Sequence, residues 1–362
     1  MNRREFLVLC SASLLAERSV RLKASRYDQS LATEGWRLFE ITTHVHVQNA
    51  SGITRAWLPT PLVSVPYQQT LGDTYQAENG TSVMVESDDI DMLLTEWAAD
   101  VDPVLTMTSR VATKDYAVDL TTPHVPPPPD LSTFAKYLRG TKLIPVDGIV
   151  KDTANQITRG AGTDIEKARA IYEWIVDNTF RDPKTRGCGT GDIRFMLETK
   201  NFGGKCADIN ALFVGLARAA GLPARDVYGL RVAASRRGAT SLGVSSADVT
   251  KAQHCRAEVY LVGFGWVPVD PADVRKVALE EPPGHLPITH EKVRYARARL
   301  FGSWEMNWVG YNRAHDVTLP RSPGKPLPYF MYPQAETANG RADSLDPDTF
   351  RYEITVHDVT NA

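Results

Sequence analysis

Near its N-terminal end the chain carries a stretch in which apolar and polar residues alternate. One face of an extended backbone would hold Phe39, Ile41, Thr43, Val45 and Val47. The intervening positions are Glu40, Thr42, His44, His46 and Gln48. Alternation with a period of two is typical of a strand with one buried face. Residues 39–47 are therefore predicted to form a half-buried β-strand.

Further short apolar runs follow, separated by Gly, Asn, Asp and Pro. They lie at residues 53–58, 82–85, 92–97 and 105–112. Short strands between turn-forming residues are typical of antiparallel β-sandwiches, so residues 33–122 are predicted to form an N-terminal β-rich domain of this type. His44 and His46 share a strand face, but no third ligand accompanies them, and we expect solvent-facing histidines rather than a metal site.

A proline-rich stretch separates this region from the rest of the chain. Residues 123–129 read Pro-His-Val-Pro-Pro-Pro-Pro, which excludes a helix or a central strand. Such a tract favours an extended and fairly stiff backbone. Residues 123–130 are therefore interpreted as a linker between two domains.

Beyond the linker the period of the apolar positions becomes helical. A capping box at residues 163–166 begins one predicted helix, and a second is expected over residues 205–220, ended by Gly221 and Pro223. Predicted strands follow at 224–232, 254–262 and 266–269. Helices first and strands afterwards favour an α+β domain over a wound parallel sheet, and we assign it residues 131–285.

The remaining residues, 286–362, are rich in aromatic side chains and end in a predicted strand at 350–356. Dense aromatic residues more often complete a core than line a substrate cleft. We therefore expect an extension that packs on the second domain.

Composition and charge exclude some classes of function. The hydrophobic fraction is 43% and the charged fraction 23%, which is ordinary for a globular protein. A formal net charge of −2 gives no basic field for nucleic acid. No apolar stretch approaches the roughly 20 residues that span a bilayer, so the chain is not expected to cross a membrane.

The first residues have the pattern of an export signal. Arg3 and Arg4 precede an apolar run over residues 6–16, and small residues around Ala24 could form a cleavage site. Paired arginines before a short apolar segment suggest Tat-type export. Residues 1–24 are thus predicted to be a signal peptide, and the mature protein is expected in the periplasm or outside the cell. A basic N-terminal helix is the weaker alternative.

The candidate chemistry begins at a cysteine that opens the helix predicted over residues 205–220. Gly203 and Gly204 deliver Cys206 to the first turn, where the helix dipole favours a thiolate over a thiol. We expect the two glycines to leave room for a substrate carbonyl. Alone, a cysteine in this position is more often a small buried hydrophobe.

A histidine and an aspartate strengthen the interpretation of the cysteine. His254 begins one predicted strand, and Asp270 ends the next, after a turn at residues 263–265. Two adjacent antiparallel strands can bring this carboxylate beside the imidazole. A thiol, an imidazole and a carboxylate are the nucleophile, base and orienting group of covalent catalysis. Asp270 alone is more often a turn residue before a proline.

These stretches resemble the transglutaminase-like superfamily, which shares the core of the papain-like cysteine proteases. The family pattern is Gly-Gly-x-Cys-x-Asp, then Gly-x-Pro-Ala-Arg, His-x-x-x-Glu and Gly-Trp-x-x-x-Asp-Pro. In this chain the matching residues are Gly203, Gly204, Cys206, Asp208, Gly221, Pro223, Ala224, Arg225, His254, Glu258, Gly265, Trp266, Asp270 and Pro271. The match covers residues 160–275, and the β-rich region before it looks like the N-terminal domain of bacterial members.

The resemblance implies a papain/transglutaminase-like catalytic core with a Cys206–His254–Asp270 triad and no cofactor or metal. Asp208 is expected to be structural. Two residues after the histidine many members carry Trp, whereas this chain has Arg256, on the same strand face as His254. A cation there would suit an anionic substrate group, or it would pair with an acidic neighbour.

Three functions remain open from the sequence. The first is a cysteine-dependent amide-bond hydrolase of the peptidase or amidase kind, which forms a thioester and releases it to water. The second is a protein-glutamine acyl transferase that makes crosslinks, and the third is a non-catalytic scaffold. The expected substrate is a peptide or protein amide, with cell-wall peptides among the candidates, while the oligomeric state is left open.

The other two cysteines beyond the signal segment are Cys188 and Cys255. Cys255 follows His254 on a strand, so its side chain is expected to point into the core, away from the cleft and from Cys206. We expect three free thiols, with Cys206 the most reactive.

Overall fold

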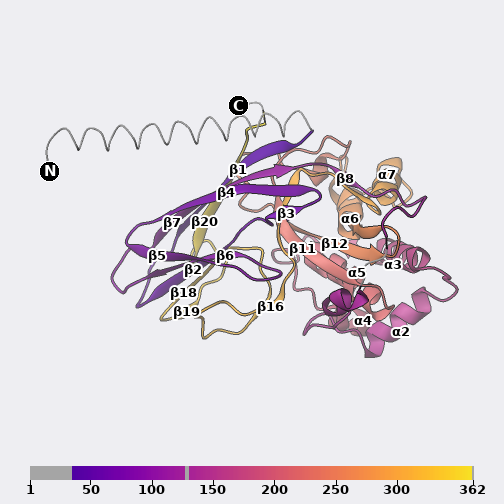
Figure 1. Cartoon of the computed structure of the whole chain (residues 1–362), viewed down its shortest axis with the longest axis horizontal. Helices are drawn as coiled ribbons and strands as arrows, with labels where there is room; N and C mark the ends of the chain where they lie inside the picture. The colour runs from indigo at the N-terminus through magenta and orange to yellow at the C-terminus, as the bar shows by residue number, and fades with distance from the viewer. Residues whose placement is uncertain (1–34, 127–129, 361–362) are drawn as a thin grey trace.

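The computed structural model describes residues 35–126 and 130–360, and it contains a β-sandwich beside a helix-covered sheet (Figure 1). The sandwich has two five-stranded sheets, ordered β20–β1–β7–β4–β3 and β19–β18–β2–β6–β5. Its strands are β1 (Arg37–His46), β2 (Thr54–Pro59), β3 (Ser64–Val65), β4 (Gln68–Ala77), β5 (Gly80–Val85), β6 (Met92–Trp97), β7 (Val104–Thr113), β18 (Gln334–Thr337), β19 (Gly340–Arg341) and β20 (Arg351–Asp358).

The alternation that predicted the first strand describes β1 well. Val45 and Val47 are buried against Leu58 and Trp97 of the facing sheet, whereas His44 points to solvent. The β-sandwich and the α+β class are therefore confirmed. Strands β3 and β4 were not predicted, because most of the side chains of β4 are exposed or half-buried and its sequence, QQTLGDTYQA, lacks an apolar face.

The C-terminal segment departs from the expected organisation. β20 pairs antiparallel with β1, from Phe39 opposite Asp358 to His46 opposite Arg351, and β18 pairs with β2. Figure 1 shows yellow β20 lying among the indigo strands. The expectation that residues 286–362 form one extension on the second domain is corrected for this last stretch. Its alternating residues complete the sandwich sheets instead.

The second part of the chain is a four-stranded antiparallel sheet, ordered β13–β12–β11–β15, with helices on one face. The strands are β11 (Ala224–Arg231), β12 (Gln253–Leu261), β13 (Gly265–Val269) and β15 (Trp308–Asn312), and the helices are α2 (Gly148–Ile157), α3 (Asp164–Asn178), α4 (Ile193–Thr199), α5 (Cys206–Ala219), α6 (Pro271–Glu280) and α7 (Glu291–Arg299). The shorter elements are η1 (Leu131–Tyr137), β8 (Tyr116–Ala117), β9 (Phe180–Arg181), β10 (Gly203–Gly204), η2 (Thr240–Leu242), β14 (Ser303–Trp304), β16 (His315–Val317) and β17 (Leu327–Tyr329).

Helix α5 is the centre of this part. Every one of its residues is buried, and it packs on β11 and β12 beneath α2, α3 and α6. The capping box predicted for α3 is present, with the Thr163 hydroxyl and the Glu166 carboxylate each accepting a backbone N–H. Most of its side chains are apolar, as expected of a helix in a domain interior, and its buried polar side chains, Asp208, Asn210 and Arg218, are hydrogen-bonded.

Motif residues outside the candidate triad stabilise the sheet. Arg225 on β11 lies opposite Glu258 on β12, with its Nε 2.6 Å from the carboxylate, and its guanidinium stacks 3.7 Å from the Trp266 ring centroid. Both members of this ion pair are buried, so each would be costly to leave without the other.

The two parts of the molecule share a core. Leu230 of β11 and Val309 of β15 pack with Phe39, Val111 and Ile354 of the sandwich. The proline-rich segment is also attached, because the N–H groups of His124 and Val125 donate to the Gly263 carbonyl. Residues 127–129 of the predicted linker lie outside the described residues.

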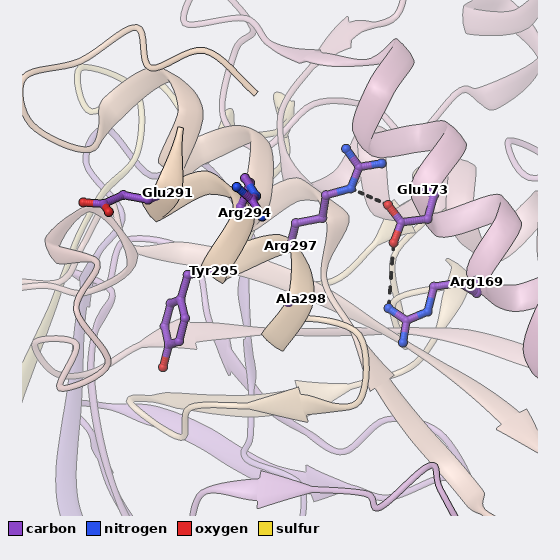
Figure 2. A pocket seen from close by; sticks show the side chains of 7 residues that line it. All are labelled: Arg169, Glu173, Glu291, Arg294, Tyr295, Arg297 and Ala298. Carbon is purple, nitrogen blue, oxygen red and sulfur yellow. Dashed lines mark hydrogen bonds and ion pairs between the residues drawn. The ribbon is translucent and has the colours of Figure 1, made fainter. Parts of the chain in front are cut away.

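The surface between α3 and α7 has a hollow, and the helices have lengths and polarities that bear on membrane crossing. A shallow hollow lies between α3 and α7, where Glu173 binds both Arg169 and Arg297 (Figure 2). Within residues 35–126 and 130–360, every helix is too short or too polar to cross a membrane.

Candidate active site

Cys206 is the first residue of α5, as the sequence predicts. Asp208, two residues on, holds the start of this helix, since its carboxylate accepts N–H groups from Lys205, Thr190 and Gly191 at 2.9–3.0 Å. The thiol therefore sits at the positive end of a buried helix dipole, which stabilises a thiolate. The structural role expected for Asp208 agrees with these contacts.

The glycines around Cys206 are needed because neighbouring side chains of the protein occupy the space where their Cβ atoms would lie. A side chain on Gly203 would meet the Phe180 ring at 2.5 Å, and one on Gly204 would meet Asp208 at 2.6 Å. Gly189, at φ +98°, lies closer still, with the Asp208 carboxylate 1.8 Å from the position of its missing Cβ. The expectation that Gly203 and Gly204 clear space for a substrate carbonyl is therefore wrong, because other side chains fill that space.

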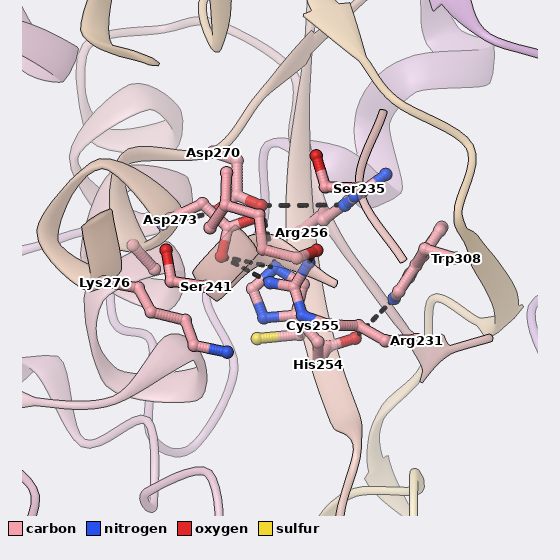
Figure 3. A network of polar contacts seen from close by, with 12 residues as sticks. Arg231, Ser235, Ser241, His254, Cys255, Arg256, Asp270, Asp273, Lys276 and Trp308 are labelled. Carbon is pink, nitrogen blue, oxygen red and sulfur yellow. Dashed lines mark hydrogen bonds and ion pairs between the residues drawn. The ribbon is translucent and has the colours of Figure 1, made fainter. Parts of the chain in front are cut away.

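His254 and Asp270 come together through the pairing of two neighbouring strands. β12 and β13 are antiparallel, and Asp270 follows the last residue of β13. His254 Nε2 lies 2.8 Å from Asp270 Oδ2, with both side chains buried (Figure 3). Because Nε2 contacts the Asp270 carboxylate, Nδ1 is the ring nitrogen that is available to exchange a proton with the Cys206 thiol.

Asp270 also caps α6. Its Oδ1 accepts the Asp273 N–H at 3.0 Å and the Asn210 side-chain amide at 3.2 Å. Asn210 lies four residues after Cys206 on the same face of α5 and also donates to the Cys255 carbonyl. This amide thus ties the helix that carries the thiol to the carboxylate beside the imidazole.

A second carboxylate, Asp273, was missed by the sequence reasoning. Its Oδ1 lies 3.4 Å from His254 Nε2 and binds the buried guanidinium of Arg231 (Figure 3). The sequence did contain a signal for Asp273. An Asp before Pro271 indicates a helix N-cap followed by proline at the first helical position, and the residue at the third helical position then lies close to the cap. Asp273 occupies that third position.

Arg256 supports this network. It is fully buried, with Nε 3.6 Å from Asp270 Oδ2, Nη1 donating to the Glu305 carbonyl and its guanidinium 4.7 Å from the Trp308 ring centroid. Trp308 also donates to the His254 carbonyl at 2.8 Å. Two roles were expected for Arg256, binding an anionic substrate group or pairing with an acidic neighbour. The structure supports the second role, because the buried guanidinium lies beside Asp270.

The charges around the imidazole favour its protonated form. Burial and the nearby Arg231 lower the pKa of His254, but Asp273 and Asp270 outweigh them, so the net pKa is raised. The pKa of Asp270 is raised by burial and by Asp273, against the opposing effects of His254 and Arg256. Burial also acts to raise the pKa of Asp273, yet Arg231 and His254 hold it far below the ordinary value.

Cys206 has the complementary shift. The neighbouring side chains of Cys188 and Cys255, followed by the hydrogen bond and charge of His254, hold the pKa of Cys206 well below its ordinary value despite burial. The pKa of Cys188 is raised by its bond to Cys206 and by burial, and that of Cys255 by burial and the same neighbour. The directions of these shifts favour Cys206 as the thiolate among the three.

The separation expected between Cys255 and Cys206 is wrong. Cys255 does point into the core, but the core on that side is α5 itself, so its thiol contacts Cys206. Cys188 is buried and donates to the Gln253 carbonyl at 3.3 Å. All three described cysteines are free thiols.

Cys206 and His254 line a cleft of about 600 Å³. One wall comes from the helix-covered part, including Lys205, Arg231 and Lys276. Another part of the lining comes from the C-terminal segment, including Tyr332 and Phe350. The cleft therefore lies where the two parts of the molecule meet.

His254, Asp270 and Asp273 are also the described group whose ligand atoms lie close enough, within 4.8 Å, to hold a metal ion. Both carboxylates already face guanidinium groups, from Arg256 and Arg231. A divalent cation would add repulsion in a buried site, so this donor set fits a protonated imidazole better than a metal.

A cysteine at the start of a buried helix, facing a histidine and an aspartate on an antiparallel sheet, defines the papain-like class of α+β protein. A sequence model of the transglutaminase-like superfamily matches residues 151–271, which include all three residues. An uncharacterized protein from Haemophilus influenzae is 37% identical over 323 residues, covering 84% of this chain and 86% of that protein. The chain belongs to the transglutaminase-like superfamily.

One solved structure shares the fold, and a second is similar over less of the chain. A Cytophaga hutchinsonii protein, provisionally described as a cysteine protease, has a TM-score of 0.51 at 16% identity, covering 89% of this chain and 98% of the other. The periplasmic domain of TgpA from Pseudomonas aeruginosa has a TM-score of 0.34 at 16% identity, over 69% and 92% of the two chains. The first similarity extends the common fold over both parts of this molecule.

Proposed function

We propose that this protein is a cysteine-dependent amide-bond hydrolase that acts through a thioester. The observation that carries the proposal is the buried 2.8 Å contact of His254 with Asp270, beside a thiol whose pKa is depressed. A lowered thiol pKa and a raised imidazole pKa favour a thiolate–imidazolium pair, the form that attacks carbonyl carbon.

The reaction follows from these three groups. The Cys206 thiolate adds to the amide carbonyl, and the backbone N–H of Cys206, the first residue of α5, is the candidate donor to the resulting oxyanion. The His254 imidazolium gives its proton to the leaving amine, so the C–N bond breaks and a thioester forms. Neutral His254 then removes a proton from water, which attacks the thioester and releases a carboxylic acid and the thiol. Asp270 keeps the imidazole oriented throughout.

The substrate proposed is a peptide or protein amide, with cell-wall peptides among the candidates. The proposed location is the periplasm or the exterior after Tat-type export, which rests on residues 1–24, outside the described part of the chain. Transfer of the acyl group to an amine would use the same three residues, and the products distinguish it from hydrolysis.

Two measurements test the proposal. Brief treatment with iodoacetamide at mildly acidic pH, followed by mass spectrometry, should modify Cys206 before Cys188 and Cys255, because ordinary thiols react slowly there. Peptides and cell-wall fragments should then release amine, and hydroxylamine should trap the acyl group as a hydroxamate. Turnover should stop in Cys206→Ala.

The contrary outcomes are specific. If Cys206 reacts with iodoacetamide no faster than Cys188 and Cys255, the result would support the alternative of a non-catalytic scaffold. Incorporation of an added amine in preference to release of free acid would assign the protein to the acyl transferases.

A further inference from the structure

The cleft around Cys206 is lined by an excess of positive charge. Its cationic residues are Arg181, Arg186, Lys205, Arg231, Lys251 and Lys276. Asp248 is the one acidic residue among the described residues of the lining. This excess is local, because the whole chain has a formal net charge of −2.

Three of these cations are arginines that form ion pairs with carboxylates outside the cleft lining. Arg181 binds Glu280, Arg186 binds Asp343, and Arg231 binds Asp273. The charges of these three guanidinium groups are therefore already compensated within the protein.

The three lysines are different. Within residues 35–126 and 130–360, neither Lys205 nor Lys251 has a carboxylate at ion-pair distance, although the charge of Lys251 does act on Asp248 of the same lining. Lys276 Nζ lies 3.7 Å from Glu280, which already binds Arg181. In the hollow of Figure 2, by contrast, Glu173 is shared by two arginines and Arg297 binds Asp177 as well.

Lys276 is a half-buried amine close to another cation of the cleft, Arg231. Burial and the neighbouring Arg231 lower the pKa of this amine to about 8, although Asp273 and Glu280 act in the opposite direction. A cation that is poorly hydrated and near like charge gains from the arrival of an anion. The three lysines line the same cleft as the Cys206 thiol and come from three places in the fold. Lys205 precedes Cys206, Lys276 lies on α6, and Lys251 comes just before β12.

We propose that the cleft selects amide substrates that carry a carboxylate near the scissile bond, and that Lys205, Lys251 and Lys276 recognise it. The inference rests on the proposed function and narrows its substrate class to peptide or protein amides that have a carboxylate close to the scissile bond. The carboxylate could belong to an acidic side chain or to a free C-terminus, and the test has an arm for each.

The first experiment measures the field at the thiol without a substrate. Second-order rate constants for alkylation of Cys206 are determined with iodoacetate, which is anionic, and with iodoacetamide, which is neutral and similar in size. Their ratio cancels changes in the thiolate fraction. Free cysteine supplies the reference, and the variants are Lys205→Gln, Lys251→Gln and Lys276→Gln, with Lys325→Gln on the sandwich side as the control.

We expect the wild-type ratio to exceed that of free cysteine at low ionic strength and to fall as salt is added. Each of the three substitutions should lower the ratio by about two- to fivefold, the range of partly exposed ion pairs, while Lys325→Gln leaves it unchanged. Ratios equal in all variants would overturn the proposal, because the imidazolium alone would then account for the attraction.

The second experiment uses matched peptides around one cleavable amide. One pair differs by Glu against Gln beside that amide, and another by a free against an amidated C-terminus. A higher kcat/KM for the charged member, reduced in the lysine variants, is the expected result, and the responding pair identifies the source of the carboxylate. Turnover of both members at equal rates refutes the charge selection but leaves hydrolysis standing. A Cys206 inert to both reagents refutes the hydrolase proposal itself.

Discussion

Replacing Asp273 by Asn tests the electrostatic account of the site. Asp273 is buried, binds Arg231 and lies 3.4 Å from His254 Nε2. The amide keeps the shape of the side chain and removes its charge. Arg231 would then be a buried cation without its partner, and breaking a buried pair in this way costs about 3–5 kcal/mol. A domain of ordinary stability, about 5–15 kcal/mol, survives such a loss and allows it to be measured.

The pH dependence of that loss has a definite sign. The pKa of Asp273 is held far below its ordinary value of 3.8 in the folded protein. A depressed carboxyl pKa stabilises the fold above the unfolded pKa, and this contribution disappears as the pH falls through the folded pKa. The stability difference between wild type and Asp273→Asn should therefore be full at neutral pH and shrink in strong acid.

The same substitution should change the imidazole. Asp273 is the largest of the charges that raise the pKa of His254, so this pKa should fall in the variant. The alkaline limit of kcat/KM, where the imidazolium loses its proton, should move to lower pH. Urea unfolding measures the stability, and an NMR titration of the His254 ring measures the pKa without any substrate.

Glu336→Gln provides the matched control. Glu336 is a buried carboxylate on β18 that accepts a hydrogen bond from Ser322 at 2.6 Å, within the sandwich. Its substitution should affect stability without moving the His254 titration. If Asp273→Asn costs less than about 1 kcal/mol and leaves the titration in place, Asp273 is a bystander and the account of the site is wrong.

Three further predictions concern the triad and the joint between the two parts. Cys206→Ala should abolish turnover yet change the free energy of unfolding by only about 1–2 kcal/mol in urea, and residual wild-type turnover would dismiss Cys206 as the nucleophile. Asp270→Asn should reduce kcat by about 10³- to 10⁴-fold, because an amide can offer an N–H to His254 Nε2 and favour the wrong tautomer; an unchanged kcat measured under saturating substrate would contradict its orienting role. Proteolytic cleavage within the proline-rich tract should leave both fragments associated on size exclusion, since β20 remains paired with β1; separation into two folded pieces would contradict this prediction.

The sequence was most informative where local pattern and structure coincide. β6 occupies residues 92–97 as predicted, because its apolar run is bounded by turn-forming residues. Cys206, His254 and Asp270 could be found because each lies at the end of a helix or strand with a recognisable start or stop signal. The capping box of α3 has the same local origin.

What the sequence could not give depends on long-range pairing. The predicted strand at 350–356 carries no mark of its partner β1, which lies more than 300 residues earlier along the chain. Contacts between Cys255 and Cys206 depend on how α5 is placed over β12, which strand alternation alone does not define. The roles of Asp273 and Arg231 likewise arise from three elements that meet only in the fold.

The pairing of β20 with β1 also determines when the cleft can exist. Arg37 and Asp358 form an ion pair although 321 residues separate them. Phe350 and Tyr352, at the start of the same strand, form part of the cleft wall. During synthesis, Cys206 and His254 leave the ribosome well before this wall does. The complete cleft can therefore form only after the last strand has been added.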